Sequence, residues 1–259
     1  LIEITLDFET YYCKKSKYSL AAKGMTYEKY IRDEKFEVIG LAVKVGNRNT
    51  EWLSPHEIQD WINHIEVAYG WENVRLIAQN AVFDASILGL KFNVYPGQIA
   101  DTMLMSKAVQ QWDGNSLDVI TRQLRTKYGW ICVQNNDGST WVGSATGENE
   151  QLKQFAVDKG TEVHDADGKH LCDFTDEAYD AYAQYCITDV DLTWSAYRFF
   201  LDYYGFPEQE IDVMTTSIEM YTYPVMELDT KVLEEVKANV NQLREESLAR
   251  AGVTLEEVR

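Results

Sequence analysis

Two carboxylates stand one residue apart near the start of the chain, in the segment TLDFET of residues 5–10. Asp7 and Glu9 follow apolar and β-branched residues, so we expect a strand on which positions i and i+2 face the same side. Two buried acids side by side are unfavourable unless a cation or a hydrogen-bond donor compensates their charge. Taken alone, the pair also fits a solvated strand end.

Two further acids follow the same logic on other elements. Asp84 ends the segment NAVFD, which follows the apolar run VRLIAQ and opens a predicted helix. Asp189 ends YCITD, where Tyr185 stands four residues earlier on the same face of a predicted helix. The alternatives are a helix cap for Asp84, and for Asp189 an ordinary helix aspartate bonded by Tyr185 or an arginine.

The ordered set of acids is more informative than any one motif. Asp7, Glu9, Asp84 and Asp189 in one pocket would raise each other's pKa, and divalent cations would relieve that repulsion. Oxygen ligands without histidine or cysteine favour Mg²⁺ or Mn²⁺ over zinc. We therefore expect two divalent cations, Mg²⁺ or Mn²⁺, in the arrangement that hydrolyses phosphodiesters.

DFET, NAVFD and YCITD resemble the three motifs of the DEDD superfamily of 3′→5′ exonucleases, in its tyrosine subtype (DEDDy). In the histidine subtype a histidine stands five residues before the last aspartate, and no histidine here has that spacing. More narrowly, the chain resembles the proofreading exonuclease domain of a phage-like family A DNA polymerase. ADTMLMSKAV, NSLDVITRQL and residues 218–236 carry this narrower resemblance, which covers about residues 1–240.

The resemblance implies a role for each catalytic residue. Asp7 would bridge both metals, and Glu9 and Asp189 would complete the site of the metal on the nucleophile side. Asp84 would hold the second metal, directly or through water. Tyr185 would orient the attacking water beside Glu9.

The resemblance also implies contacts to the substrate. Asn80 matches a position that contacts the terminal nucleotide, and Thr10 is a candidate for a backbone or hydroxyl contact to the 3′ end. Phe83 packs near the terminal base or, in the interpretation we prefer, in the core. Asp101 in ADTM is expected to be structural and to hold the loop near the site.

The charge distribution bears on the partner. The chain has a net charge of −18, which by itself argues against a nucleic-acid partner. Residues 1–50, however, hold 7 acids and 9 bases, whereas residues 131–180 hold 11 acids and 3 bases. Lys14, Lys15 and Lys17 are candidates for contacts to backbone phosphates, with a solvated loop as an equal alternative.

The order of predicted elements indicates an α/β protein. We expect a ribonuclease-H-like mixed sheet flanked by helices, in which three antiparallel strands are extended by parallel βα units. The predicted strands are 1–7, 36–45, 50–54, 74–80 and, as a strand or turn, 98–102. The predicted helices of this part are 54–68, 84–92 and 116–129.

The second half of the chain is predicted to be mainly helical. Residues 131–147 are expected to be irregular, 148–160 helical and 161–175 a loop, followed by helices at 176–204, 208–220 and 229–251. We assign residues 1–206 to an exonuclease domain with an irregular insertion at about 130–175. Residues 207–259 would be a helical extension that resembles the start of a polymerase thumb.

The expected function is hydrolysis at a single-stranded or frayed DNA 3′ end, as the proofreading part of a polymerase. The alternatives are an RNase D-like exonuclease acting on RNA, and a non-catalytic domain that binds DNA or supports a polymerase. This sequence does not contain polymerase fingers or a palm. We therefore expect either a piece of a longer polymerase chain or a polymerase-like protein that kept only the exonuclease part.

The cysteines show no pairing pattern, so we expect reduced thiols in the cytoplasm of a phage host or bacterium. No apolar run approaches ~18 residues, so we expect no membrane contact. We also expect a monomer.

Overall fold

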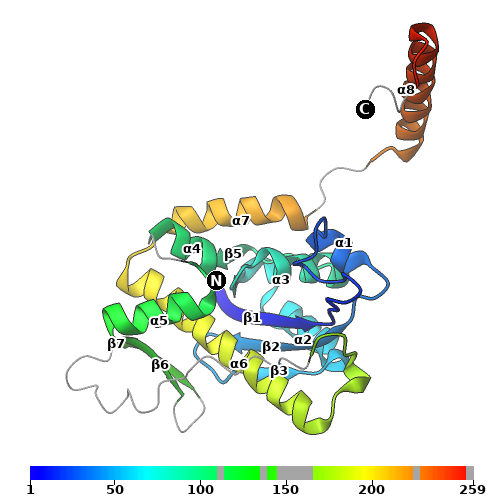
Figure 1. Cartoon of the computed structure of the whole chain (residues 1–259). Coiled ribbons are helices and arrows are strands. Elements are labelled where there is room, and N and C mark those ends of the chain that lie inside the picture. The colour runs from blue at the N-terminus through cyan, green and yellow to red at the C-terminus, as the bar shows by residue number, and fades with distance from the viewer. Residues whose placement is uncertain (110–113, 135–138, 145–165, 224–227, 255–259) are drawn as a thin grey trace. The chain divides into compact units, whose positions relative to one another are not determined.

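The structure is a computed structural model that describes residues 1–109, 114–134, 139–144, 166–223 and 228–254. Five strands form one mixed sheet in the order β3-β2-β1-β4-β5 (Figure 1). The central strand β1 pairs antiparallel with β2 and parallel with β4. The strands of this sheet are β1 Ile2–Thr10, β2 Val38–Val45, β3 Glu51–Leu53, β4 Val74–Ala78 and β5 Gln98–Asp101.

The predicted sheet is confirmed: β1, β2 and β3 form an antiparallel meander, and β4 and β5 extend it in parallel. Helices flank the sheet, and the fold is ribonuclease-H-like. Their bounds are α1 Tyr27–Arg32, α2 Pro55–Tyr69, α3 Val82–Ile87, α4 Thr102–Val109, α5 Leu117–Tyr128, α6 Asp176–Arg198, α7 Glu208–Thr222 and α8 Thr230–Ala251.

Alternate residues of β1 face opposite sides of the sheet. Ile4, Leu6 and Phe8 join the main apolar core together with buried residues of α2 and α3. Asp7 and Glu9 face the other side, where α6 contacts β1, β2 and β4 (Figure 1). The i, i+2 spacing therefore places both acids under α6.

Local signals set the helix ends as predicted. Ser54 precedes α2, Pro55 is its first residue, and the Glu57 carboxylate accepts the Ser54 N–H at 2.9 Å. Gly129 follows α5 with a φ of 61°, a left-handed conformation that glycine adopts at little cost.

The prediction of irregular structure at 131–147 is wrong for the described part of that range. Residues 130–134 and 140–144 form an antiparallel pair, β6 Trp130–Gln134 and β7 Thr140–Ser144. Both segments are rich in β-branched and aromatic residues, and the sequence NNDG between them is typical of a hairpin turn. The predicted helix at 148–160 lies outside the described residues.

The segment between β1 and β2 contains a small hairpin and the helix α1, neither of which the sequence analysis predicted. Cys13 and Tyr18 exchange backbone hydrogen bonds, so residues 14–17 form the tip of a small hairpin. Tyr18 is buried and donates its hydroxyl to the carbonyl oxygen of Tyr30 in α1 at 2.8 Å. This segment is therefore packed onto α1.

The chain divides into two compact units, residues 1–223 and 224–259. α7 belongs to the first unit, because Thr215 Oγ1 accepts the N–H of Ile99 in β5 at 2.8 Å. The boundary predicted at residue 206 precedes α7, so the first unit is longer than the predicted exonuclease domain.

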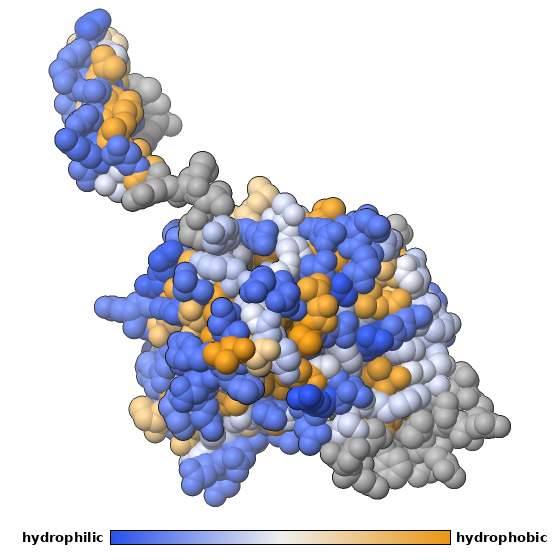
Figure 2. All heavy atoms as spheres, turned by 180° about the vertical axis from the view of Figure 1, so that it is seen from behind, coloured by the Kyte–Doolittle hydropathy of each residue, from blue (hydrophilic) through white to orange (hydrophobic). Residues whose placement is uncertain are grey.

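α8 belongs to the second unit and contains no buried residue. Apolar residues gather along one side of this helix (orange in Figure 2), and its exposed apolar side chains are Val232, Leu233, Val236, Val240 and Leu243. No helix in the described ranges is both long and apolar enough to cross a membrane.

Candidate active site

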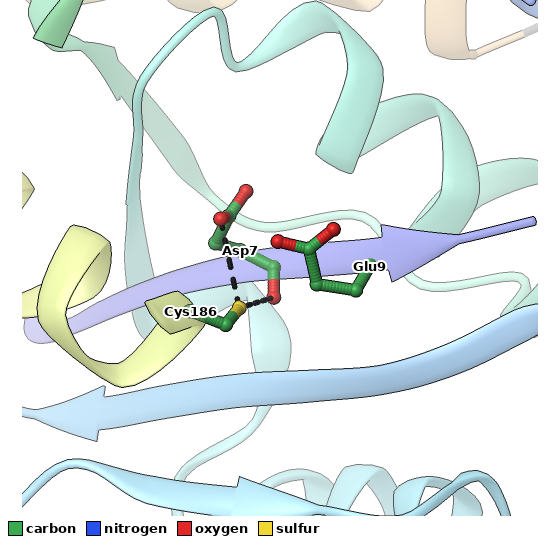
Figure 3. A group of neighbouring side chains, drawn as sticks. All are labelled: Asp7, Glu9 and Cys186. Atoms are coloured by element: carbon green, nitrogen blue, oxygen red, sulfur yellow. Dashed lines mark hydrogen bonds between the residues drawn. The ribbon is translucent and has the colours of Figure 1, made fainter. Parts of the chain in front are cut away.

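Asp7 and Glu9 lie side by side on β1 with their carboxylates on one face of the strand (Figure 3). One ligand atom each from Asp7, Glu9 and Cys186 of α6 all lie within 4.8 Å of one another. The Cys186 thiol donates to the Asp7 carbonyl oxygen at 3.3 Å, and its sulfur lies 3.6 Å from Asp7 Oδ2. The two acids are therefore enclosed between β1 and α6.

Asp84 joins them from the first turn of α3, which follows β4. Its side chain is almost completely buried, and Oδ1 accepts the backbone N–H of Phe8 at 3.0 Å. Phe8 stands between Asp7 and Glu9 in β1, so this hydrogen bond holds the third carboxylate beside the first two. The predicted position of Asp84 after a parallel strand explains how it reaches the site.

Asp189 and Tyr185 come from α6. They are one helical turn apart on the same face of α6, and Asp189 is close enough to raise the pKa of Tyr185. Asp189 is buried, and its charge raises the pKa of both Asp7 and Glu9. The structure therefore brings together the four acids and the tyrosine that the sequence singled out.

Burial is the largest cause of the raised pKa values in this pocket. It raises the pKa of Asp7 to about 7, with the charge of Asp189 as the next cause. The pKa values of Glu9 and Asp84 are also well above the usual range, by burial first and by the charge of Asp7 second. Burial and the charge of Asp189 raise the pKa of Tyr185, so its hydroxyl keeps its proton near neutral pH.

Tyr182 is a site residue that the sequence analysis missed. Its hydroxyl donates to Glu9 Oε2 at 2.6 Å, and its ring stacks on Phe174 at 5.6 Å between centroids. Tyr182 precedes Cys186 by four residues and Asp189 by seven, so all three lie on one face of α6. The helical spacing was visible in the sequence, but nothing there showed that Glu9 would lie opposite.

Asp101 is structural, as predicted. It is fully buried at the end of β5, and four backbone N–H groups donate to its carboxylate. The donors, at 2.8–3.3 Å, are Asn80, Ala81, Met103 and Leu104. Asp101 thus fixes the loop that carries Asn80 to the start of α3.

The predicted substrate residues border this loop. The Asn80 side chain lies 3.1 Å from the Tyr27 hydroxyl, and Asn80 has a φ of 63°. Phe83 packs on the core beside Tyr27, with 5.9 Å between the ring centroids. Thr10 is buried, and its hydroxyl lies 2.9 Å from that of Tyr30. Contacts of Asn80, Phe83 and Thr10 to a substrate stay predictions.

The donor set fits a divalent metal ion. Asp7, Glu9, Asp84 and Asp189 offer only carboxylate oxygens, which suit Mg²⁺ and Mn²⁺. Among the ion pairs of the described residues, none involves Asp7, Glu9 or Asp84. Burial raises the pKa of the Cys186 thiol, so the protonated sulfur is a poor ligand.

Residues 26–129 match the family model described as 3′-5′ exonuclease. The match spans less than half of the chain, and it includes Asn80, Asp84 and Asp101. Asp7 and Asp189 lie outside it. A search of curated proteins returned no significant match.

Solved structures of nucleases resemble the fold. RNase D of Trypanosoma brucei, solved in complex with RNA U12, has a TM-score of 0.50 at 14% identity, covering 87% of this chain and 66% of that one. The catalytic core of RRP6 from T. brucei has a TM-score of 0.45 at 10% identity, covering 89% and 49%. Brucella melitensis NrnC has a TM-score of 0.43 at 11% identity, covering 85% and 83%. The chain thus spans about half the length of the RRP6 core. The family match and the RNase D fold together support a hydrolytic exonuclease.

Proposed function

We propose that this protein is a 3′→5′ exonuclease that removes nucleotides from a single-stranded or frayed DNA 3′ end with Mg²⁺ or Mn²⁺. The observation that carries the proposal is the convergence of Asp7, Glu9, Asp84 and Asp189 from three distant segments into one pocket, in which Asp84 and Asp189 are buried and Asp7 and Glu9 are half-buried. Such a pocket is electrostatically unfavourable without cations.

The four carboxylates would hold the cations. Bound there, two divalent ions would lower the pKa of the attacking water and stabilise charge on the phosphate and the leaving oxygen. Tyr185 keeps its proton, so its hydroxyl would orient the attacking water by hydrogen bonding beside Glu9. The Asn80 amide would position the terminal nucleotide. Water oxygen bonds to phosphorus, the bond to the 3′ oxygen of the preceding nucleotide breaks, and that oxygen takes up a proton.

The preference for DNA, and a place as the proofreading part of a family A polymerase, are part of this proposal. The motifs DFET, NAVFD and YCITD and the likeness of residues 218–236 to the exit from a polymerase exonuclease domain support it. The reading frame around the segment tests the polymerase context: a downstream polymerase palm is expected, and a stop codon close to residue 259 would favour a standalone nuclease.

The activity is tested by nucleotide release from DNA and RNA oligonucleotides of the same sequence, with Mn²⁺ and with EDTA. We expect release of nucleoside monophosphates from DNA that Mn²⁺ supports and that Asp7→Ala with Glu9→Ala abolishes. Lys107→Glu on the exposed side of α4 is the control and should keep full activity. Undiminished release by the double variant would overturn the assignment.

The other outcomes separate the alternatives. Faster release from RNA would replace the DNA assignment by an RNase D-like one. Absence of release together with absence of Mn²⁺ binding by calorimetry would identify a non-catalytic domain.

A further inference from the structure

The segment between β1 and β2 carries a concentration of positive charge in an acidic protein. Residues 14–32 contain six basic side chains and one acidic side chain, whereas the whole chain has a net charge of −18. All six basic side chains are exposed: Lys14, Lys15, Lys17, Lys23, Lys29 and Arg32. Like charges gathered on one surface repel one another and attract a polyanion.

Part of this charge surrounds a hollow, which we call the cationic hollow. It has a volume of about 400 Å³, and its charged lining consists of Lys17, Lys23, Lys29, Arg32 and a single acid, Asp33. Asp33 accepts the backbone N–H of Lys35 at 3.0 Å, and Arg32 also pairs with Glu28 at 3.0 Å. Lys17 and Lys23 form none of the ion pairs found among the described residues.

The hairpin tip that carries Lys17 is held in place by the protein. The backbone N–H of Lys14 donates to Asp167 Oδ1 at 2.8 Å, and the N–H of Gly168 donates to the carbonyl oxygen of Tyr12 at 2.7 Å. The lysines therefore stand on an anchored backbone, which lowers the entropic cost of binding a ligand.

A second hollow adjoins the cationic hollow, and Glu28 is the one acid among the described residues in its lining. It has a volume of about 650 Å³ and shares Met25 with the cationic hollow. Its lining includes Tyr27, Tyr221 and Ser86, and the Tyr221 side chain is 74% exposed. We call it the aromatic hollow.

Tyr27 links the aromatic hollow to the catalytic residues. Its hydroxyl lies 3.1 Å from the Asn80 amide nitrogen. Tyr27 thus lines the aromatic hollow and also contacts Asn80, which precedes Asp84 by four residues.

We infer that the two hollows form the track along which a single-stranded nucleic acid leaves the active site. The inference rests on the proposed exonuclease function. The terminal nucleotide lies at Asn80, the following bases stack in the aromatic hollow on Tyr27 and Tyr221, and backbone phosphates lie in the cationic hollow. Stacked aromatic rings beside a basic groove are how proteins hold single strands without reading their sequence.

The test compares a dinucleotide, which fills only the terminal positions, with a long single-stranded oligodeoxynucleotide. Lys17→Glu with Lys23→Glu should lower kcat/KM for the long substrate by about tenfold at low salt and leave that for the dinucleotide unchanged. The control with the same change in charge is Lys107→Glu with Lys127→Glu, on exposed positions of α4 and α5 far from α1 in Figure 1. Equal losses in both double variants, or an equal loss on both substrates, would overturn the track.

Binding of a labelled oligonucleotide in EDTA tests the track without catalysis, so its failure is distinguishable from failure of the proposed function. For Lys17→Glu with Lys23→Glu, each lost phosphate contact should reduce the magnitude of the slope of log affinity against log salt concentration by about 0.7. Tyr221→Ala, which removes a stacking surface, should weaken binding by about tenfold. Unlabelled single strand should displace the probe and polyglutamate should not. Equal displacement by polyglutamate would contradict a nucleic-acid track.

Discussion

At the scale of single residues, the active site depends on acids that lie beside one another. None of the ion pairs among the described residues involves Asp7, Glu9 or Asp84, so no basic side chain in those pairs compensates their charge. Asp7 and Glu9 share one face of β1, and Asp84 is held by the N–H of Phe8. Raised pKa values follow from burial and mutual repulsion. This pocket is therefore suited to binding cations, and the same repulsion lowers the stability of the folded protein when no cation is bound.

Neutralising one acid should have opposite effects on the stability of the metal-free protein and on metal binding. Asp7→Asn is expected to raise the free energy of unfolding of the metal-free protein by at least about 1 kcal/mol at pH 8, because it removes a half-buried charge whose ionisation is unfavourable beside Asp189. The same variant should lose the stabilisation that Mn²⁺ gives to the wild type. Thermal melts with EDTA and with Mn²⁺ measure both effects; a variant less stable in EDTA would contradict the repulsion.

Tyr182 should act by positioning Glu9. Tyr182→Phe removes the hydroxyl that donates to Glu9 and should weaken Mn²⁺ binding by about tenfold to a hundredfold, as is typical of partners that orient metal ligands. Calorimetry with Mn²⁺ measures the effect. Tyr179→Phe is the matched control, since Tyr179 lies on the same helix and donates its hydroxyl to the Ile39 carbonyl oxygen. Equal Mn²⁺ affinities in the two variants would show that Tyr182 has no such role.

At the scale of elements, a buried ion pair joins β2, α6 and β7. Lys44 is fully buried, and its Nζ donates to Asp191 Oδ1 at 2.9 Å and to Thr140 Oγ1 at 2.6 Å. Thr50 also donates to Asp191. Asp191 follows Asp189 by two residues, so the pair holds the part of α6 that carries the last acid of the site.

Breaking this ion pair should destabilise the fold strongly. Lys44→Met leaves Asp191 charged and uncompensated in the interior, and should lower the free energy of unfolding by about 3–5 kcal/mol. Adding Asp191→Asn removes that charge and should recover part of the loss. Urea unfolding of both variants measures this, and a double variant less stable than Lys44→Met would mean that the charge of Asp191 is compensated elsewhere.

At the scale of the whole molecule, residues 1–223 contain the sheet, its flanking helices and every residue of the candidate site. α8 lies in the other unit and buries none of its residues.

A fragment of residues 1–223 should fold by itself. We expect its melting temperature to lie within about 3 °C of that of the full chain, because the sheet and the helices that pack on it lie within residues 1–223. Nucleotide release and Mn²⁺ binding by the fragment should match those of the full chain. An unfolded or aggregated fragment would show that residues 224–259 stabilise the first unit.

The sequence by itself determined what depends on local order along the chain. Alternation placed Asp7 and Glu9 on one face of a strand, and helical spacing placed Tyr185 and Asp189 on one face of α6. Capping residues marked the ends of α2 and α5. These patterns need no knowledge of distant segments, which is why they were predictable.

Only the tertiary structure decided which distant surfaces meet. Nothing along the chain pairs Tyr182 with Glu9 or Lys44 with Asp191, because those contacts join residues more than a hundred positions apart. The β6–β7 pair has local signals in its β-branched and aromatic residues, but its attachment to Lys44 through Thr140 has none. The motif TLDFET supplied two acids, and the packing of α3 and α6 against β1 made them a pocket, because enclosure depends on how separate elements fill space.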